Sequence, residues 1–182
     1  MGLLALKEEF FPHYTYKDYC QWEGKWEIIS GIAYARTPAP SILHQSVSHK
    51  IDGQLFQLLE ECEHCHALLP VDWQVAEDTI VQPDHLAICD ELPQSVKLTV
   101  TPSLIFEILS DNTRKKDENL KFELFQAAGV LYYCLVDPET KSARLFRLED
   151  KRYVDQGTFS KECTTISLPD CDLLFNFERI WV

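Results

Sequence analysis

The chain has 182 residues, 46% of them hydrophobic and 25% charged, which excludes a disordered or fibrous protein. Its net charge of -12 opposes a general DNA-coating role, because nucleic acid repels an acidic protein. No apolar run approaches the roughly 20 residues of a membrane helix, and residues 1–10 lack the order of a signal peptide. We therefore expect a cytoplasmic protein with no membrane partner, whose seven cysteines are reduced, mostly buried thiols.

Hydrophobic periodicity and turn residues predict a single domain over 1–182 that contains both helices and strands. Helices are expected at 15–23, 41–61 and 117–128, the first capped by Thr15 and the last ended by Gly129. Strands are expected in 26–36, and at 67–76, 79–89, 103–109, 130–136, 142–148 and 152–158. Prolines break the chain at 37–40, and the apolar segment 173–182 packs on the core or on a partner. This order predicts an α/β (α+β) fold with a mixed central sheet flanked by helices and additional antiparallel strands.

Two acids stand in apolar strands, where an isolated carboxylate is costly. Glu107 lies in the segment 103–109, which is apolar on both faces, so this acid must be protonated, paired or bound to metal. Asp84 follows Pro83, whose missing N–H weakens the strand ladder there. If the two strands are neighbours, the carboxylates meet, and an all-oxygen pair suits Mg²⁺ or Mn²⁺. The alternative is a strand-end acid satisfied by backbone donors or by an ion pair with Lys121.

Three further features have a structural and a functional interpretation. Lys121 lies on the apolar stripe of the helix 117–128 and either reaches the surface or points at a buried acid. Glu27, between two apolar residues, is another inward-facing acid. His44 is either a packed histidine or one that orients an acid or a substrate phosphate. The basic run of Arg114, Lys115 and Lys116 is either a solvated loop or the place where a polyanion binds.

A fourth pattern, Cys62, His64, Cys65 and His66, matches the CxxCH pattern of haem attachment and contains zinc-ligand types. Four ligands spaced so tightly do not wrap a tetrahedral ion, and haem attachment needs export and a second axial ligand. We expect no haem and interpret the segment as a polar helix end with incidental thiols.

The ordered set of motifs resembles the putative restriction endonuclease family, formerly a domain of unknown function, of the PD-(D/E)XK nuclease superfamily. The matching positions are 26–31, His44 after a proline turn, 83–84, 102–110, Thr113, the pair Asp117 and Lys121, 128–130 and 135–138. The resemblance implies a restriction-endonuclease-like fold over the whole chain.

The resemblance also implies a metal-dependent phosphodiesterase acting on nucleic acid, with DNA as the favoured substrate, as an endonuclease with a Mg²⁺ or Mn²⁺ cofactor. Asp84 and Glu107 match the metal-binding acids, and Glu27 matches an acid from the early segment. The superfamily lysine two residues after the second acid is replaced by Leu109, and Lys121 is the match that substitutes for it.

This departure, together with the net charge of -12, keeps an alternative open: a catalytically degenerate nuclease fold that acts as a binding or interaction module. A nuclease of this size is also expected to form a homodimer. We place the contact at the apolar tail of Phe175, Phe177, Ile180 and Trp181.

Overall fold

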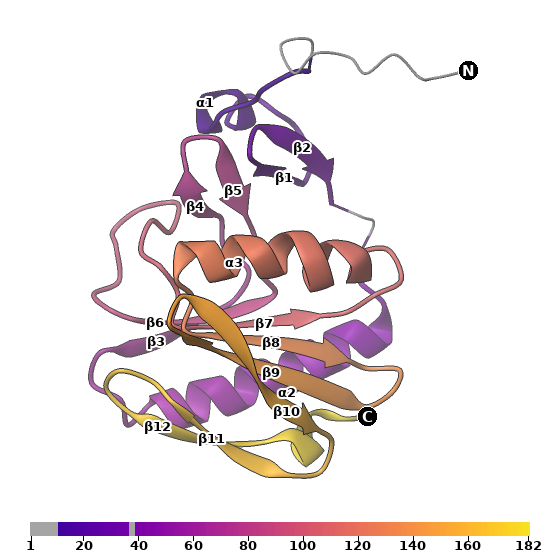
Figure 1. Ribbon diagram of the computed structural model, residues 1–182, viewed down its shortest axis with the longest axis vertical. Coiled ribbons are helices and arrows are strands. Elements are labelled where there is room, and N and C mark those ends of the chain that lie inside the picture. Colours follow the sequence, from indigo (N-terminus) through magenta and orange to yellow (C-terminus); the bar gives the residue numbers. More distant parts are fainter. Residues whose placement is uncertain (1–10, 37–38) are drawn as a thin grey trace.

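The computed structural model describes residues 11–36 and 39–182 (Figure 1). Residues 1–10, on which the expectation of no signal peptide rests, and two residues of the predicted break at 37–40 lie outside these ranges. No helix in the described ranges is both long and apolar enough to cross a membrane.

A six-stranded mixed sheet forms the centre of the molecule, in the order β10-β9-β8-β7-β6-β3. Its strands are β3 (Cys65–Leu68), β6 (His85–Cys89), β7 (Leu104–Ile108), β8 (Tyr132–Asp137), β9 (Ser142–Glu149) and β10 (Arg152–Phe159). The β7–β8 pair is parallel and the other pairs are antiparallel. All five residues of β7 are buried, as expected for the central strand of a sheet that is covered on both faces.

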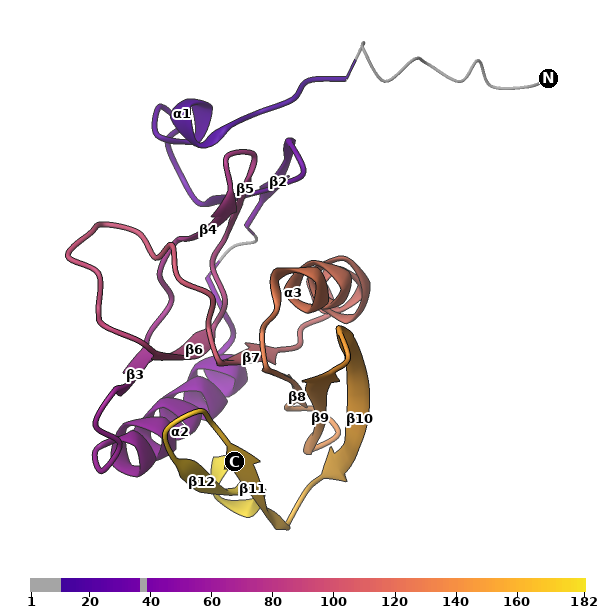
Figure 2. The ribbon, with the colours of Figure 1, turned by 60° about the vertical axis from the view of Figure 1, so that its left-hand side comes forward.

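Helices cover the two faces of this sheet (Figure 2). On one face lies α2 (Ile42–Leu59), which packs against β3, β6 and β7 and places its apolar stripe of Val47, Ile51 and Leu55 in the core. On the other face lies a continuous helical segment, the π-helix η2 (Lys116–Lys121) followed by α3 (Phe122–Ala128). Gly129 ends α3 in the left-handed conformation with a φ of 86°, which a glycine adopts without strain.

A second sheet, in the order β2-β1-β5-β4, stands on the same side of the central sheet as α3 (Figures 1 and 2). It is built from β1 (Trp26–Ile29), β2 (Ile32–Ala35), β4 (Trp73–Ala76) and β5 (Thr79–Val81), with the short helix α1 (Tyr16–Tyr19) beside it. Trp73 of β4 packs against Phe125 of α3, with ring centroids 5.7 Å apart. This contact joins the small sheet to the core of the central sheet.

The predicted strands 67–76 and 79–89 are each divided in two by a proline. The first becomes β3 and β4 on either side of Pro70, and the second becomes β5 and β6 on either side of Pro83. Proline has no N–H for the ladder, so each break lets the chain pass from one sheet to the other. The α+β class predicted from the sequence is confirmed.

The C-terminal segment packs on its own chain. Strands β11 (Cys163–Ser167) and β12 (Asp172–Asn176) form a hairpin that is followed by the 3-10 helix η3 (Phe177–Ile180). Phe175, Phe177 and Ile180 are fully buried beside α2. The tail therefore covers the core, as predicted, but the prediction that these three side chains form a dimer contact is wrong because no part of them is exposed.

Four of the seven cysteines form disulfides, Cys62–Cys171 and Cys65–Cys89. The expectation of reduced, mostly buried thiols is therefore wrong for these four, and two of the three remaining cysteines are exposed. The Cys65–Cys89 disulfide follows from the sheet topology, because the antiparallel pairing of β3 with β6 places the two cysteines opposite one another. Because Cys62 and Cys65 are both in disulfides, neither thiolate is available to zinc, and neither thiol is available for haem attachment.

Candidate active site

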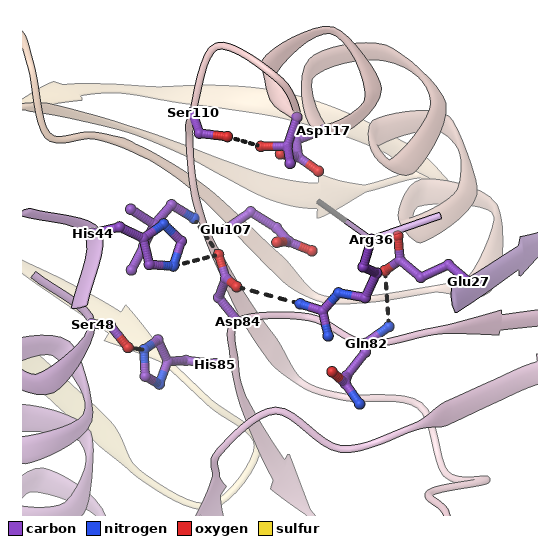
Figure 3. A network of polar contacts seen from close by, with 12 residues as sticks. Glu27, Arg36, His44, Ser48, Gln82, Asp84, His85, Glu107, Ser110 and Asp117 are labelled. Carbon is purple, nitrogen blue, oxygen red and sulfur yellow. Dashed lines mark hydrogen bonds and ion pairs between the residues drawn. The ribbon is translucent and has the colours of Figure 1, made fainter. Parts of the chain in front are cut away.

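Two neighbouring strands bring Asp84 and Glu107 to the same cleft (Figure 3). His85 pairs with Phe106 in the antiparallel β6–β7 ladder, so Asp84 precedes one strand where Glu107 lies near the end of the other. The backbone N–H of Ile108 donates to Asp84 Oδ2 over 2.9 Å, which fixes one carboxylate beside the other. The cleft has a volume of about 1250 Å³ and separates α2 and the small sheet from η2.

Lys121 is buried at the base of this cleft and contacts three carboxylates. Its Nζ lies 2.6 Å from Glu107 Oε1, 3.1 Å from Glu27 Oε1 and 3.6 Å from Asp117 Oδ1. Burial lowers the pKa of the Lys121 ammonium, but the three carboxylates outweigh it and hold the pKa well above its usual value. Lys121 is therefore charged at neutral pH, so it donates hydrogen bonds and positive charge and does not act as a base.

Burial also raises the pKa of the Glu107 carboxyl well above its usual value. The charge of Lys121 opposes this shift, and the neighbouring acids add to it. Asp117 is 2% exposed, and burial raises the pKa of its carboxyl as well. Its Oδ1 is buried without a hydrogen-bond partner among the described residues. The base of the cleft thus carries more negative charge than Lys121 alone neutralises.

Glu27 closes the other side of this cluster from β1. Burial raises its pKa, but the ammonium groups of Lys121 and Lys116 outweigh burial and lower the pKa to about 2. The Lys116 ammonium forms a close ion pair with Glu27 Oε2, and the backbone N–H of Gln82 donates to Oε1 over 3.0 Å. A residue from the small sheet thereby holds two lysines of η2 at the cleft.

Arg36 and His44 flank Asp84 on opposite sides (Figure 3). Arg36 Nη2 lies 4.0 Å from Asp84 Oδ1, and His44 Nε2 lies 3.7 Å from Asp84 Oδ2. His44 stands on the first turn of α2 and faces the cleft, so it is not packed in the apolar core. One turn later, Ser48 shares a 2.8 Å hydrogen bond with the buried His85, which follows Asp84 in the chain.

The structure separates the basic run of Arg114, Lys115 and Lys116. The two lysines line the cleft. Arg114 faces away from it and pairs with Asp137 at 2.9 Å and with Glu118 at 3.4 Å. A helical turn begins at this run, and consecutive helical residues point in different directions.

Sequence reasoning gave no role to Asp117 or Arg36. The signal for Asp117 was present, because it lies four residues before Lys121 and a helix brings such residues to one face. Arg36 carried no comparable signal: only the folding of β2 against the start of β6 brings it to Asp84.

The donor set fits a hard divalent cation bound by few protein ligands. In the described part of the chain, no three histidine, cysteine or acidic side chains meet as a metal cage. Mg²⁺ is commonly held by one or two carboxylates, with waters and substrate phosphates as the remaining ligands. Asp84 and Glu107 supply such a pair. Burial raises the pKa of the Glu107 carboxyl and the neighbouring acids add to that shift, so a bound cation would favour its ionised form.

The fold and the acidic cleft define a restriction-endonuclease-like protein. The model of the family described as "Putative restriction endonuclease" (Uma2) matches residues 15–173, and the chain belongs to this family. It is also similar to a crystal structure from Anabaena variabilis described as a putative nuclease belonging to DUF820, with a TM-score of 0.73. The two chains are 14% identical over 92% of this chain and 97% of the other, so this likeness shows the fold alone. A search of curated proteins found no match.

Proposed function

We propose that the protein is a metal-dependent endonuclease that hydrolyses phosphodiester bonds of DNA. The observation that carries the proposal is the meeting of Asp84, Glu107 and Lys121 in one cleft of a protein of this family. A phosphodiester carries negative charge that repels a nucleophile, so hydrolysis needs positive charge at the phosphate. The three side chains account for that charge, one directly and two through a cation.

Asp84 and Glu107 are the residues that would hold Mg²⁺ or Mn²⁺. When bound, such a cation supplies Lewis acidity and lowers the pKa of a coordinated water. Lys121, kept protonated by its carboxylates, stabilises negative charge on the attacking oxygen or on the phosphate. Glu27 is a positioning residue, because its two ion pairs hold Lys121 and Lys116 in place.

The rim of the cleft supplies the substrate contacts. Arg36, His44 and Lys115 line it above the acidic base, where phosphate oxygens of a bound strand would lie. Lys116 is paired with Glu27 and adds positive charge to the base of the cleft. Arg114, predicted from the sequence to contact the same substrate, is outside the cleft.

Cleavage of plasmid and single-stranded DNA in Mg²⁺ or Mn²⁺ tests the proposal. We expect Asp84→Ala and Glu107→Gln each to lower the cleavage rate by at least ~100-fold. Asp90→Asn is the matched control, because it removes one acidic charge at the exposed far end of β6. Equal cleavage by the wild type and the two cleft variants would refute the proposed roles.

The competing function is a non-catalytic binding module on the same fold. It is favoured by one observation, the direct 2.6 Å pairing of Glu107 with Lys121, which also satisfies a buried acid that does no chemistry. Calorimetry with Mn²⁺ separates the two. If the protein is an endonuclease, Mn²⁺ should bind with a measurable heat that Asp84→Ala abolishes. If it is a binding module, it should bind DNA without binding any cation.

A further inference from the structure

A second cavity lies beside the cleft, on the other side of η2. Its volume is about 470 Å³, within the range of roughly 300–1,000 Å³ that is usual for small-molecule pockets. One wall is a single helical face formed by Arg114, Glu118 and Phe122, which are spaced four residues apart. We call this cavity the lateral groove.

The floor of the lateral groove is the outer part of the central sheet. Leu135 of β8, Arg144 of β9 and Thr158 of β10 stand opposite one another in the strand register and form a row across three strands. Beneath them Phe146 is buried and packs edge-to-face on Phe122, with ring centroids 4.9 Å apart, and the exposed Arg144 guanidinium lies 4.8 Å over the Phe146 ring. The groove therefore offers the planar Arg144 guanidinium, supported from below by an aromatic ring, between the helix and the sheet.

The polar groups of the lateral groove include both donors and acceptors. Arg114 is paired with Asp137 and Glu118, and Arg144 donates to Asp155 through Nε at 3.0 Å and Nη2 at 2.8 Å. Three carboxylates thus face two guanidinium groups, which disfavours a phosphate in the groove. A neutral base is favoured instead, because its edge carries donors and acceptors and its rings stack on aromatic or guanidinium planes.

The lateral groove adjoins the candidate active site through one shared wall residue. Leu109 lines both cavities, and it follows Glu107 by two residues on the same face of the sheet. A strand whose phosphate lies over Asp84 and Glu107 would therefore lead its neighbouring nucleotide past Leu109 into the groove.

We propose that the lateral groove binds the base of an unpaired nucleotide next to the scissile phosphate of a DNA strand. This inference rests on the proposed function and adds a substrate class to it. The base must be unpaired because the groove side chains occupy the edge that a complementary base would use. The protein consequently prefers single-stranded or frayed DNA over intact duplex.

Fluorescence anisotropy tests the proposal by measuring, in Ca²⁺, how tightly the protein binds a labelled single DNA strand of about twelve nucleotides. One abasic site is moved along the strand. We expect one position at which loss of the base weakens binding about tenfold, since stacking on a protein surface contributes that much. Thr158→Trp fills the groove at an exposed position, so it should weaken binding of the intact strand and abolish the abasic penalty.

Arg147→Ala is the matched control, because Arg147 is exposed on β9 and is three residues from Arg144, on the opposite face of the strand. It should keep the full abasic penalty. A strand with no sensitive position, or a penalty that persists in Thr158→Trp, would overturn the groove assignment. So would tighter binding of an intact duplex or of the corresponding RNA strand.

The two proposals fail in different ways. Mg²⁺-dependent cleavage without any abasic penalty would overturn the groove and leave the endonuclease proposal intact. A penalty in a protein that cleaves no DNA would support the groove and overturn the endonuclease proposal. Absence of DNA binding would overturn the groove.

Discussion

Replacement of Lys121 with methionine removes the ammonium group that three buried carboxylates share. Lys121 is 3% exposed, and its contacts with Glu107, Glu27 and Asp117 span 2.6 to 3.6 Å. Methionine has a similar length and needs no hydrogen-bond partner, so the substitution tests charge more than packing. The carboxylates left behind must repel one another or take up protons.

The expected cost follows from this burial. Removing one partner of a buried ion pair destabilises a protein by about 3–5 kcal/mol, because the other charge stays desolvated. Protonation of Glu107 relieves part of the cost, since burial already raises the pKa of its carboxyl. A group whose folded pKa is raised stabilises the fold below its unfolded pKa and loses that effect as pH rises through the folded pKa. The deficit of Lys121→Met should therefore shrink on acidification from neutral pH to about pH 5.

Urea unfolding followed by circular dichroism measures this cost, with and without Mg²⁺. A cation held by Asp84 and Glu107 should stabilise Lys121→Met more than it stabilises the wild type, because it compensates the same carboxylates. Lys115→Met is the control, since Lys115 is exposed on the adjacent turn. If Lys121→Met loses no more than the ~0.5 kcal/mol of a surface substitution, the shared-charge argument fails.

Three further outcomes follow from the same structure. Thiol titration of the unfolded, unreduced protein should detect three reactive thiols out of seven, and detection of all seven would contradict the disulfides. Cys171→Ser opens a disulfide that spans 109 residues, so thermal or urea unfolding should show a loss of about 4–5 kcal/mol on the chain-entropy model; Cys163→Ser, at an exposed free thiol, is the control. Glu27, with a pKa of about 2, stabilises the fold above its unfolded pKa of about 4.3 and loses this effect as pH falls toward 2. Lys116→Met should raise the Glu27 pKa and move acid unfolding to higher pH, and an unchanged acid midpoint would refute the assignment.

Local sequence signals predicted most of the elements but not their division between two sheets. The helix α2 and the strand β7 follow directly from apolar periodicity, and the predicted strand region 26–36 forms β1 and β2 on either side of a turn at Ser30 and Gly31, both with positive φ. The splits at Pro70 and Pro83 carried a local signal, since proline cannot donate in a ladder. Which sheet each half joins depends on pairing with residues far away in the chain.

The candidate site was predictable where burial made an acid conspicuous. Glu107 stood out because its strand is apolar on both faces, and the structure places it beside Asp84, as expected for neighbouring strands. The Glu27–Lys116 pair and the approach of Arg36 to Asp84 were beyond reach, because each joins residues of different elements through tertiary folding. The disulfides were missed for the same reason: only strand pairing places Cys65 opposite Cys89.

The net charge of -12 raised the main objection to a nucleic-acid substrate, and the local arrangement of charge answers it. At physiological salt the field of distant surface acids is screened within about 8 Å, so the groups lining the cleft decide what binds there. Those groups are layered, with carboxylates at the base and Arg36, His44 and Lys115 at the rim. An acidic base repels phosphate until a cation occupies it, whereas Arg36 and Lys115 at the rim attract phosphate at any time. DNA affinity should therefore depend on divalent cation more steeply than in a uniformly basic protein, and substitution of Asp84 should remove that dependence while leaving the rim contribution in place.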